Sequence, residues 1–321
     1  MSQMNVFENI RWVVVDIYQS LARIAVPVFI MLTGALLLQP AKKESIGVFF
    51  KKRWSRIGFP FIFWGAIYFA WDFLVVRVPF SAGAIIQGIL NGPYSQFWYL
   101  YVLFGLYLLT PVLRIFMANA DPAVIKYFLV VSLTGLAVMP IFGSLIPYTL
   151  NVNVFTVTGF VGYFVLGAYL LTVQVRRSTI TIFMILGIAL TTIGTYILAA
   201  TVGGTQMYYF QQYFSPTIIL SSVMVFLLLL KIKPPPVEQG TARLSIGSKL
   251  VKTISQNSLC LFLFHVIVLQ SIENGYFGFA INRLTLNPII EVPLMTTIVL
   301  FISLAVIILL KKIPHFEKVI G

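Results

Sequence analysis

Two arginines at the start of an apolar segment have the charge and the separation needed to bind an anion. Arg53 and Arg56 lie in a basic run, residues 51–56, directly ahead of the apolar residues 57–78. Side chains three apart on a helical turn face one way, and each planar guanidinium can hold phosphate oxygens at two points. With support from Lys52, the pair suits a phosphate-rich ligand. The alternative is a cluster that only sets membrane topology or contacts lipid head groups.

His265 is the second residue of interest, because it lies inside an apolar run. An ionisable side chain in hydrocarbon costs on the order of 2.5–3.5 kcal/mol by insertion scales, so its presence needs a reason. About eleven residues at roughly 1.5 Å each separate it from the start of its segment near Ile254, which places it near the middle of a bilayer. His265 is either a neutral imidazole hydrogen-bonded to a neighbouring helix or a general base in a buried cavity.

Arg23 stands at the start of the first long apolar segment. One interpretation is that its guanidinium extends to the membrane interface while its alkyl chain covers apolar surface. The other is that it points inward, at an acceptor hydroxyl or at a negative charge that develops during a reaction.

These residues are expected to lie on or beside transmembrane helices. Runs of roughly 18–22 apolar residues indicate membrane spans. We predict nine, at residues 21–38, 57–78, 96–117, 123–142, 156–173, 180–201, 214–231, 254–272 and 291–310. The expected fold is an all-α, polytopic membrane bundle that forms a single domain over residues 1–321, with no inserted soluble domain.

The distribution of charge orients this bundle. Of the 22 Lys and Arg residues, 18 fall in connections on one side, and the opposite side keeps only Arg11, Arg23, Arg77 and Arg283. Cytoplasmic connections carry the excess of Lys and Arg, so we predict a cytoplasmic C-terminus and an N-terminus outside.

The composition excludes a soluble protein and argues against a nucleic-acid binder. The chain is 59% hydrophobic and only 10% charged, and the topology rule accounts for most of its formal charge of +13. Cys260, the single cysteine, lies within a span, so the sequence offers no intrachain disulfide and no zinc cluster, and we expect no metal. The partners that remain are membrane lipids and a polar substrate.

Two uncharged connections on the outer side, 143–155 and 202–213, are rich in Tyr, Asn, Gln and Thr. They are interpreted either as an aromatic belt at the membrane interface or as a polar, aromatic mouth that stacks on sugars.

The first twenty residues do not resemble a secretory signal. They contain Glu8, Arg11 and Asp16 and lack a continuous apolar core. Nine spans with an outer N-terminus would require this weakly amphipathic leader to cross the bilayer. An additional helix before residue 1 would give ten spans and two cytoplasmic ends, so we expect that the chain as written starts late.

Five segments, in order, resemble the acyltransferase-3 family of membrane acyltransferases, and in particular its surface-polysaccharide O-acetyltransferase branch. They are Arg23 to Gly34 with Pro27, Lys52-Arg53-Trp54-Ser55-Arg56 with Pro60 and Phe61, Phe97-Trp98-Tyr99-Leu100 with Tyr107 and Pro111, Gly162 to Gly167, and Asn257 to His265. Each segment is largely apolar, and the resemblance rests on their order and spacing over residues 21–270.

The resemblance implies ten core helices and transfer of an acyl group, usually acetyl, from coenzyme A in the cytoplasm to a hydroxyl of an extracytoplasmic or lipid-linked glycan. It makes Arg53 and Arg56 contacts for acetyl-CoA, with Lys52 in support, and makes Arg23, Trp98 and His265 candidates for an internal cavity. It also implies a location in the inner (plasma) membrane.

One departure bears on activity. The family's first helix, with its arginine and a histidine usually taken as central to catalysis, has no counterpart here, and Thr33 replaces the commoner serine before Gly34. Among the residues present, His265 is then the expected catalytic base. The competing hypotheses are a glycan or lipid transporter and an inactive, truncated homologue. The sequence does not indicate an oligomeric state.

Overall fold

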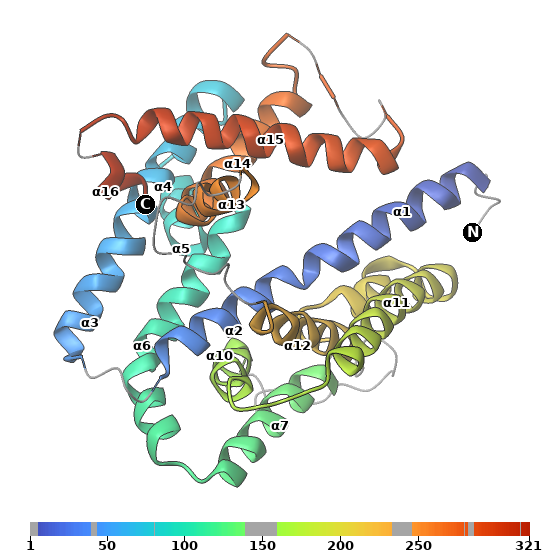
Figure 1. Cartoon of the computed structure of the whole chain (residues 1–321). Helices are drawn as coiled ribbons and strands as arrows, with labels where there is room; N and C mark the ends of the chain where they lie inside the picture. The colour runs from blue at the N-terminus through green and yellow to red at the C-terminus, as the bar shows by residue number, and fades with distance from the viewer. Residues whose placement is uncertain are drawn as a thin grey trace. The chain divides into compact units, whose positions relative to one another are not determined.

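The computed structural model of the chain describes residues 6–39, 44–79, 81–138, 159–232, 246–278, 280–281, 286–314 and 316–321. In these residues the chain forms helices and no strands, which confirms the predicted all-α, polytopic fold (Figure 1). The chain divides into two compact units, each built from two separate stretches of sequence. The first unit is Met1–Lys43 with Leu108–Pro235, and the second unit is Glu44–Tyr107 with Pro236–Gly321.

The first unit contains six helices in its described residues and a 3-10 turn. They are α1 (Val6–Arg23), α2 (Ala25–Leu37), α7 (Pro122–Val138), α10 (Gly159–Leu170), α11 (Arg177–Thr201), η4 (Gly204–Gln211) and α12 (Pro216–Leu230).

The second unit contains α3 (Ile46–Arg53), the π-helical turn η1 (Trp54–Gly58), α4 (Phe59–Trp71), the π-helical turn η2 (Asp72–Val76), α5 (Ala82–Asn91), η3 (Ser95–Phe97), α13 (Ile246–Gln256), α14 (Ser258–Glu273), α15 (Pro288–Leu310) and α16 (Phe316–Ile320). Helix α6 (Trp98–Asn119) begins in the second unit and ends in the first.

Each of the nine predicted spans overlaps an apolar helical stretch. In the part of the chain that the structure describes, six stretches are long and apolar enough to cross a membrane, and a seventh counts if Gly247–Gln256 and Ser258–Glu273, bent by 84°, form one broken span. Two shorter apolar helices, Pro122–Gly135 and Gly159–Leu170, match the predicted spans at 123–142 and 156–173. Residues 139–142 and 156–158 of those two spans, and the whole outer connection 143–155, lie outside the described ranges.

The predicted start of the first span is wrong. Helix α1 begins at Val6 and continues into α2, so that Ile10–Leu37 forms one long apolar stretch (Figure 1). The cause is the placement of polar groups: Asp16 and Ser20 are buried inside the first unit, while Ile10, Ile17 and Leu21 are exposed. A helix with a polar stripe on its buried side and apolar residues on its exposed side has no continuous apolar run in its sequence. The span prediction searched for such runs and therefore missed the first half of this helix.

Helices α2 and α10 of the first unit cross at two glycines. A Cβ built on Gly34 would overlap the backbone carbonyl of Phe164, and a Cβ built on Gly167 would overlap that of Met31. Such close approach is possible only for residues without a side chain, which is how small residues hold helices together in membranes. The resembling segments at 23–34 and 162–167 therefore pack directly against each other.

The second unit is tied together by its C-terminal helix. The Trp64 indole nitrogen donates to the Ile320 carbonyl at 3.1 Å, and the Phe63 ring meets the Phe316 ring edge-on at 5.7 Å. Trp64 and Ile320 are almost fully buried. These contacts hold α16 against α4, the helix that follows the arginine pair.

Candidate active site

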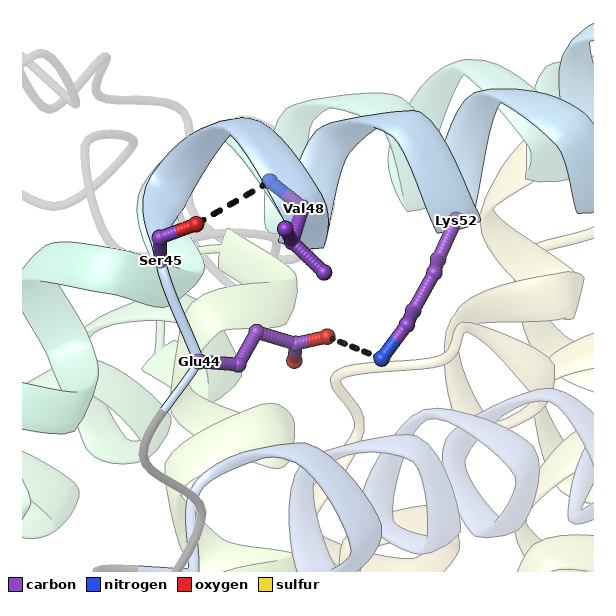
Figure 2. Close-up of polar contacts among 4 residues, drawn as sticks. All are labelled: Glu44, Ser45, Val48 and Lys52. Atoms are coloured by element: carbon purple, nitrogen blue, oxygen red, sulfur yellow. Dashed lines mark hydrogen bonds and ion pairs between the residues drawn. The ribbon is translucent and has the colours of Figure 1, made fainter.

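The arginine pair lies where α3 passes through the wide turn η1 into α4. The Ser45 hydroxyl accepts a hydrogen bond from the Val48 amide at 3.4 Å and caps the start of α3 (Figure 2), as serine does at helix starts. Pro60, two residues past η1, has no amide hydrogen and its ring crowds the carbonyl four residues earlier. A π-helical turn relieves this conflict and is often found at functional sites.

Arg53 is half-buried beside two aromatic rings. Its guanidinium carbon lies 5.1 Å from the centre of the Phe49 ring and 6.0 Å from that of Tyr107. Both distances fall within the range of a cation–π interaction. The Arg53 Nε–H is buried and has no hydrogen-bond partner in the described part of the chain. Arg53 thus retains an unused donor that an anion can accept.

Arg56 is exposed, unlike Arg53. The Tyr107 hydroxyl nevertheless lies close enough to both guanidinium groups to interact with them electrostatically. The two arginines therefore direct positive charge at one region, marked by Tyr107 on α6.

Lys52 has a partner of its own. Its ammonium lies 3.0 Å from the Glu44 carboxylate, and the Lys52 side chain is 62% exposed (Figure 2). The Glu44 side chain is only 14% exposed, so loss of the pair would leave a mostly buried carboxylate without this cation. Lys52 therefore contributes an exposed positive charge next to Arg53 while it stays paired with Glu44.

His265 is half-buried on α14, and its tautomer follows from its contacts. Its Nδ1 lies 2.8 Å from the Phe262 carbonyl and 3.2 Å from the Leu261 carbonyl. A carbonyl oxygen only accepts, so in the neutral ring Nδ1 carries the hydrogen and Nε2 keeps its lone pair. His265 thus has the form of a general base that is oriented by its own helix.

A series of aromatic side chains, two of them on α6, runs between the arginine pair and His265. Tyr99 meets the Phe262 ring edge-on at 5.5 Å, and Phe262 in turn lies 6.2 Å from the His265 ring. Tyr99 also interacts electrostatically with Tyr107, eight residues and about 12 Å further along α6. The second unit therefore joins the arginine pair to His265 through Tyr107, Tyr99 and Phe262.

The remaining predicted residues lie in different surroundings. Trp98 is half-buried at the start of α6, with its ring 6.1 Å from that of Tyr99. Arg23 ends α1 in the first unit, with its guanidinium carbon 5.3 Å from the centre of the Tyr213 ring. Seven residues earlier on the same helix, the Asp16 carboxylate accepts a hydrogen bond from Gln211 at 2.6 Å.

Tyr99 and Tyr107 were missed as site residues, although both belong to a segment that carries the family resemblance. The signal that would have found them is periodicity. Tyr99, Leu103 and Tyr107 recur every four residues on one face of α6, and that face meets the residues beside His265 and Arg53.

Comparison with protein families matches one, described as an acyltransferase domain, over residues 2–311. Curated proteins and solved structures give no significant match. The family match spans nearly the whole chain and agrees with the resemblance in the five segments. The chain therefore belongs to the acyltransferase-3 family of membrane acyltransferases.

Proposed function

We propose that the protein transfers an acyl group, acetyl in the simplest case, from acyl-CoA in the cytoplasm to a hydroxyl of an extracytoplasmic or lipid-linked glycan. This is the reaction of the surface-polysaccharide O-acetyltransferase branch that the sequence resembles. One observation carries the proposal. In the second unit of this acyltransferase-3 family member, a chain of aromatic contacts joins Arg53, which has an unused N–H donor, to His265, whose Nε2 has a free lone pair.

The arginine pair fits the phosphates of the donor. A buried Nε–H without a partner is costly, because it gave up hydrogen bonds to water and gained none, and a phosphate oxygen would satisfy it. Arg56 adds a second, exposed guanidinium near the same tyrosine, and Lys52 adds an exposed ammonium next to Arg53 in the sequence. Acyl-CoA would supply an activated thioester, and the basic residues of this chain would bind and orient it.

His265 performs the proton transfer in this proposal. Its Nε2 accepts the proton of the acceptor hydroxyl as the hydroxyl oxygen attacks the thioester carbonyl. The new C–O bond forms, the C–S bond breaks, and His265 returns the proton to the departing thiolate. The hydrogen bond from Nδ1 to Phe262 keeps the ring in the required orientation throughout.

The orientation follows from charge. One span is preceded by Lys51, Lys52, Arg53 and Arg56, and another is followed by Lys311 and Lys312. The positive-inside rule supports a cytoplasmic location for both groups. We accordingly assign the protein to the inner (plasma) membrane, with a cytoplasmic C-terminus and the donor side facing inward.

The test is acetyl-CoA binding and acyl transfer with protein purified in detergent or nanodiscs. Arg53→Ala and Arg56→Ala should each weaken acetyl-CoA binding by about 10-fold to 100-fold, since hydrogen bonds to charged groups contribute roughly 1.5–3 kcal/mol. Lys252→Ala, at an exposed lysine of the same unit, is the control and should bind normally. Unchanged affinity in both arginine variants would refute the donor assignment.

His265→Ala should bind acetyl-CoA like the wild type and lose about 10²-fold to 10⁴-fold in the rate of acyl transfer to a glycan acceptor. A His265→Ala protein that acylates at the normal rate would remove His265 from the reaction. If proteoliposomes that contain the protein move glycan across the bilayer without acylating it, the transporter hypothesis is favoured instead.

A further inference from the structure

A second group of polar side chains in the second unit lies beyond His265 and plays no part in the mechanism above. It comes from three places in the sequence: the end of α4 with the start of η2, the connection before α6, and α14. We call it the outer polar cluster; its members are Tyr68, Trp71, Asp72, Tyr94, Gln96 and Gln270.

Direct contacts hold the cluster together. The Tyr68 and Tyr94 rings stack with centres 4.7 Å apart, and the Gln270 amide donates to the Tyr94 hydroxyl. The Tyr68 hydroxyl and the Gln96 amide both donate to the Leu263 carbonyl, at 2.7 Å and 3.3 Å. Figure 1 shows α4 and α14, which supply these groups, within the same part of the fold.

Asp72 completes the cluster. Tyr68, Trp71 and Asp72 stand three and four residues apart, so they share one face of the helix. The Asp72 carboxylate interacts electrostatically with the hydroxyls of Tyr68 and Tyr94. Lys52–Glu44 is the one ion pair found in the described ranges, so no described cation neutralises Asp72.

Three polar atoms of the cluster are buried without a hydrogen-bond partner in the described residues: Trp71 Nε1, Gln96 Oε1 and Gln270 Oε1. The side chain of Gln96 is only 7% exposed. Its orientation is fixed, because its amide nitrogen must face the Leu263 carbonyl, which leaves Oε1 free. Buried polar atoms are almost always paired in native proteins, so these atoms point to a ligand.

The chemistry of the free atoms defines that ligand. Gln96, Gln270 and Asp72 offer acceptor oxygens, and the Trp71 N–H offers one donor. A group with several hydroxyls satisfies such a set, because each hydroxyl both donates and accepts. A carboxylate does not, because it can only accept and Asp72 would repel it.

We propose that the outer polar cluster binds the acceptor as an uncharged sugar and discriminates against sugars that carry a carboxylate. The role of this sugar as acceptor rests on the proposed acyltransferase function, whereas the binding preference rests on the cluster alone.

The location of the cluster suits an acceptor of His265. Gln96 and Tyr99 stand three residues apart, so they face α14 from the same side and contact it at Leu263 and Phe262, close to His265. Gln270 lies five residues beyond His265, a rise of about 7.5 Å along α14 and a turn of about 140° around it. The two side chains therefore leave α14 in different directions, and the cluster binds a part of the acceptor other than the hydroxyl that meets Nε2.

The test uses saturation-transfer NMR on the full-length protein in nanodiscs without acyl donor, with methyl glucoside and methyl glucuronide as probes. Wild-type protein should bind the glucoside and bind the glucuronide at least tenfold more weakly. Gln96→Leu and Gln270→Leu should each weaken glucoside binding by roughly 3-fold to 10-fold, as expected for one lost hydrogen bond. Gln87→Leu, at an exposed glutamine of α5, is the matched control and should leave binding unchanged.

Asp72→Asn probes the discrimination directly. Removal of the negative charge should narrow the preference for glucoside over glucuronide at an unchanged melting temperature. Equal binding of the two sugars by the wild type, or equal effects of Gln96→Leu and Gln87→Leu, would overturn the inference. A third outcome separates the two proposals. If the protein binds sugar through the cluster but transfers no acyl group, the proposed function is refuted and the sugar-binding site stands.

Discussion

The two glycines at the crossing of α2 and α10 allow a quantitative prediction. In Gly34→Ala or Gly167→Ala, the added methyl group would overlap the backbone of the facing helix, at Phe164 or Met31. Backbone cannot move aside as a flexible side chain can, so the two helices must separate. Overpacking of this kind costs about 1–3 kcal/mol, and each kcal/mol lowers the melting temperature of a domain of 150–250 residues by roughly 2–4 °C.

The assay is thermal unfolding of the purified protein in detergent, followed by tryptophan fluorescence. The matched control is Gly105→Ala, because a Cβ at Gly105 in α6 would have no atom within 4 Å. This substitution should be neutral or slightly stabilising, since alanine favours a helix over glycine by up to about 1 kcal/mol.

The double variant adds a further constraint. Once Gly34→Ala has pushed the helices apart, Gly167→Ala has less to displace. The loss of stability in the double variant should therefore be smaller than the sum of the losses in the two single variants. If Gly34→Ala and Gly105→Ala unfold at the same temperature, the close crossing of α2 and α10 does not exist as described.

Two further predictions concern local contacts. Asp16→Ala should lower the free energy of unfolding by about 1–3 kcal/mol, because it leaves the buried Gln211 amide without its acceptor. Thermal unfolding measures this loss, with Lys126→Ala, at an exposed lysine of the same unit, as the reference, and equal effects of the two changes would contradict it. Ser45→Ala should cost about 1 kcal/mol through loss of the cap on α3; faster hydrogen exchange at the Val48 amide would report it, and unchanged exchange would count against the cap.

The sequence was sufficient to locate the apolar helices and the residues with unusual chemistry. Long apolar runs identified the spans because a membrane requires them. His265 stood out because an ionisable group within such a run is expensive. These features depend only on nearby residues, and a single sequence records them directly.

Features that depend on contacts between distant segments were not predictable. The packing of helix α1 was not predictable, because its hydrogen-bond partners Gln211 and Thr192 lie far along the chain. Gln96 had no local signal, since its role emerges only when its amide meets the Leu263 carbonyl of α14. The π-helical turn at Trp54–Gly58 likewise changes the directions of Arg53 and Arg56 from those of a regular helix, and spacing alone does not reveal it.

That turn also sets the rotational phase between the two ends of one long helical stretch, Ile46–Val76. Each residue in a helix turns the chain by about 100° and advances it by about 1.5 Å. Loss of one residue between Trp54 and Gly58 would therefore swing the far end of the stretch, with Tyr68 and Asp72, through more than a quarter turn relative to Arg53. A substitution in this stretch changes one side chain, whereas a change in its length near Pro60 would uncouple the two ends in a single step.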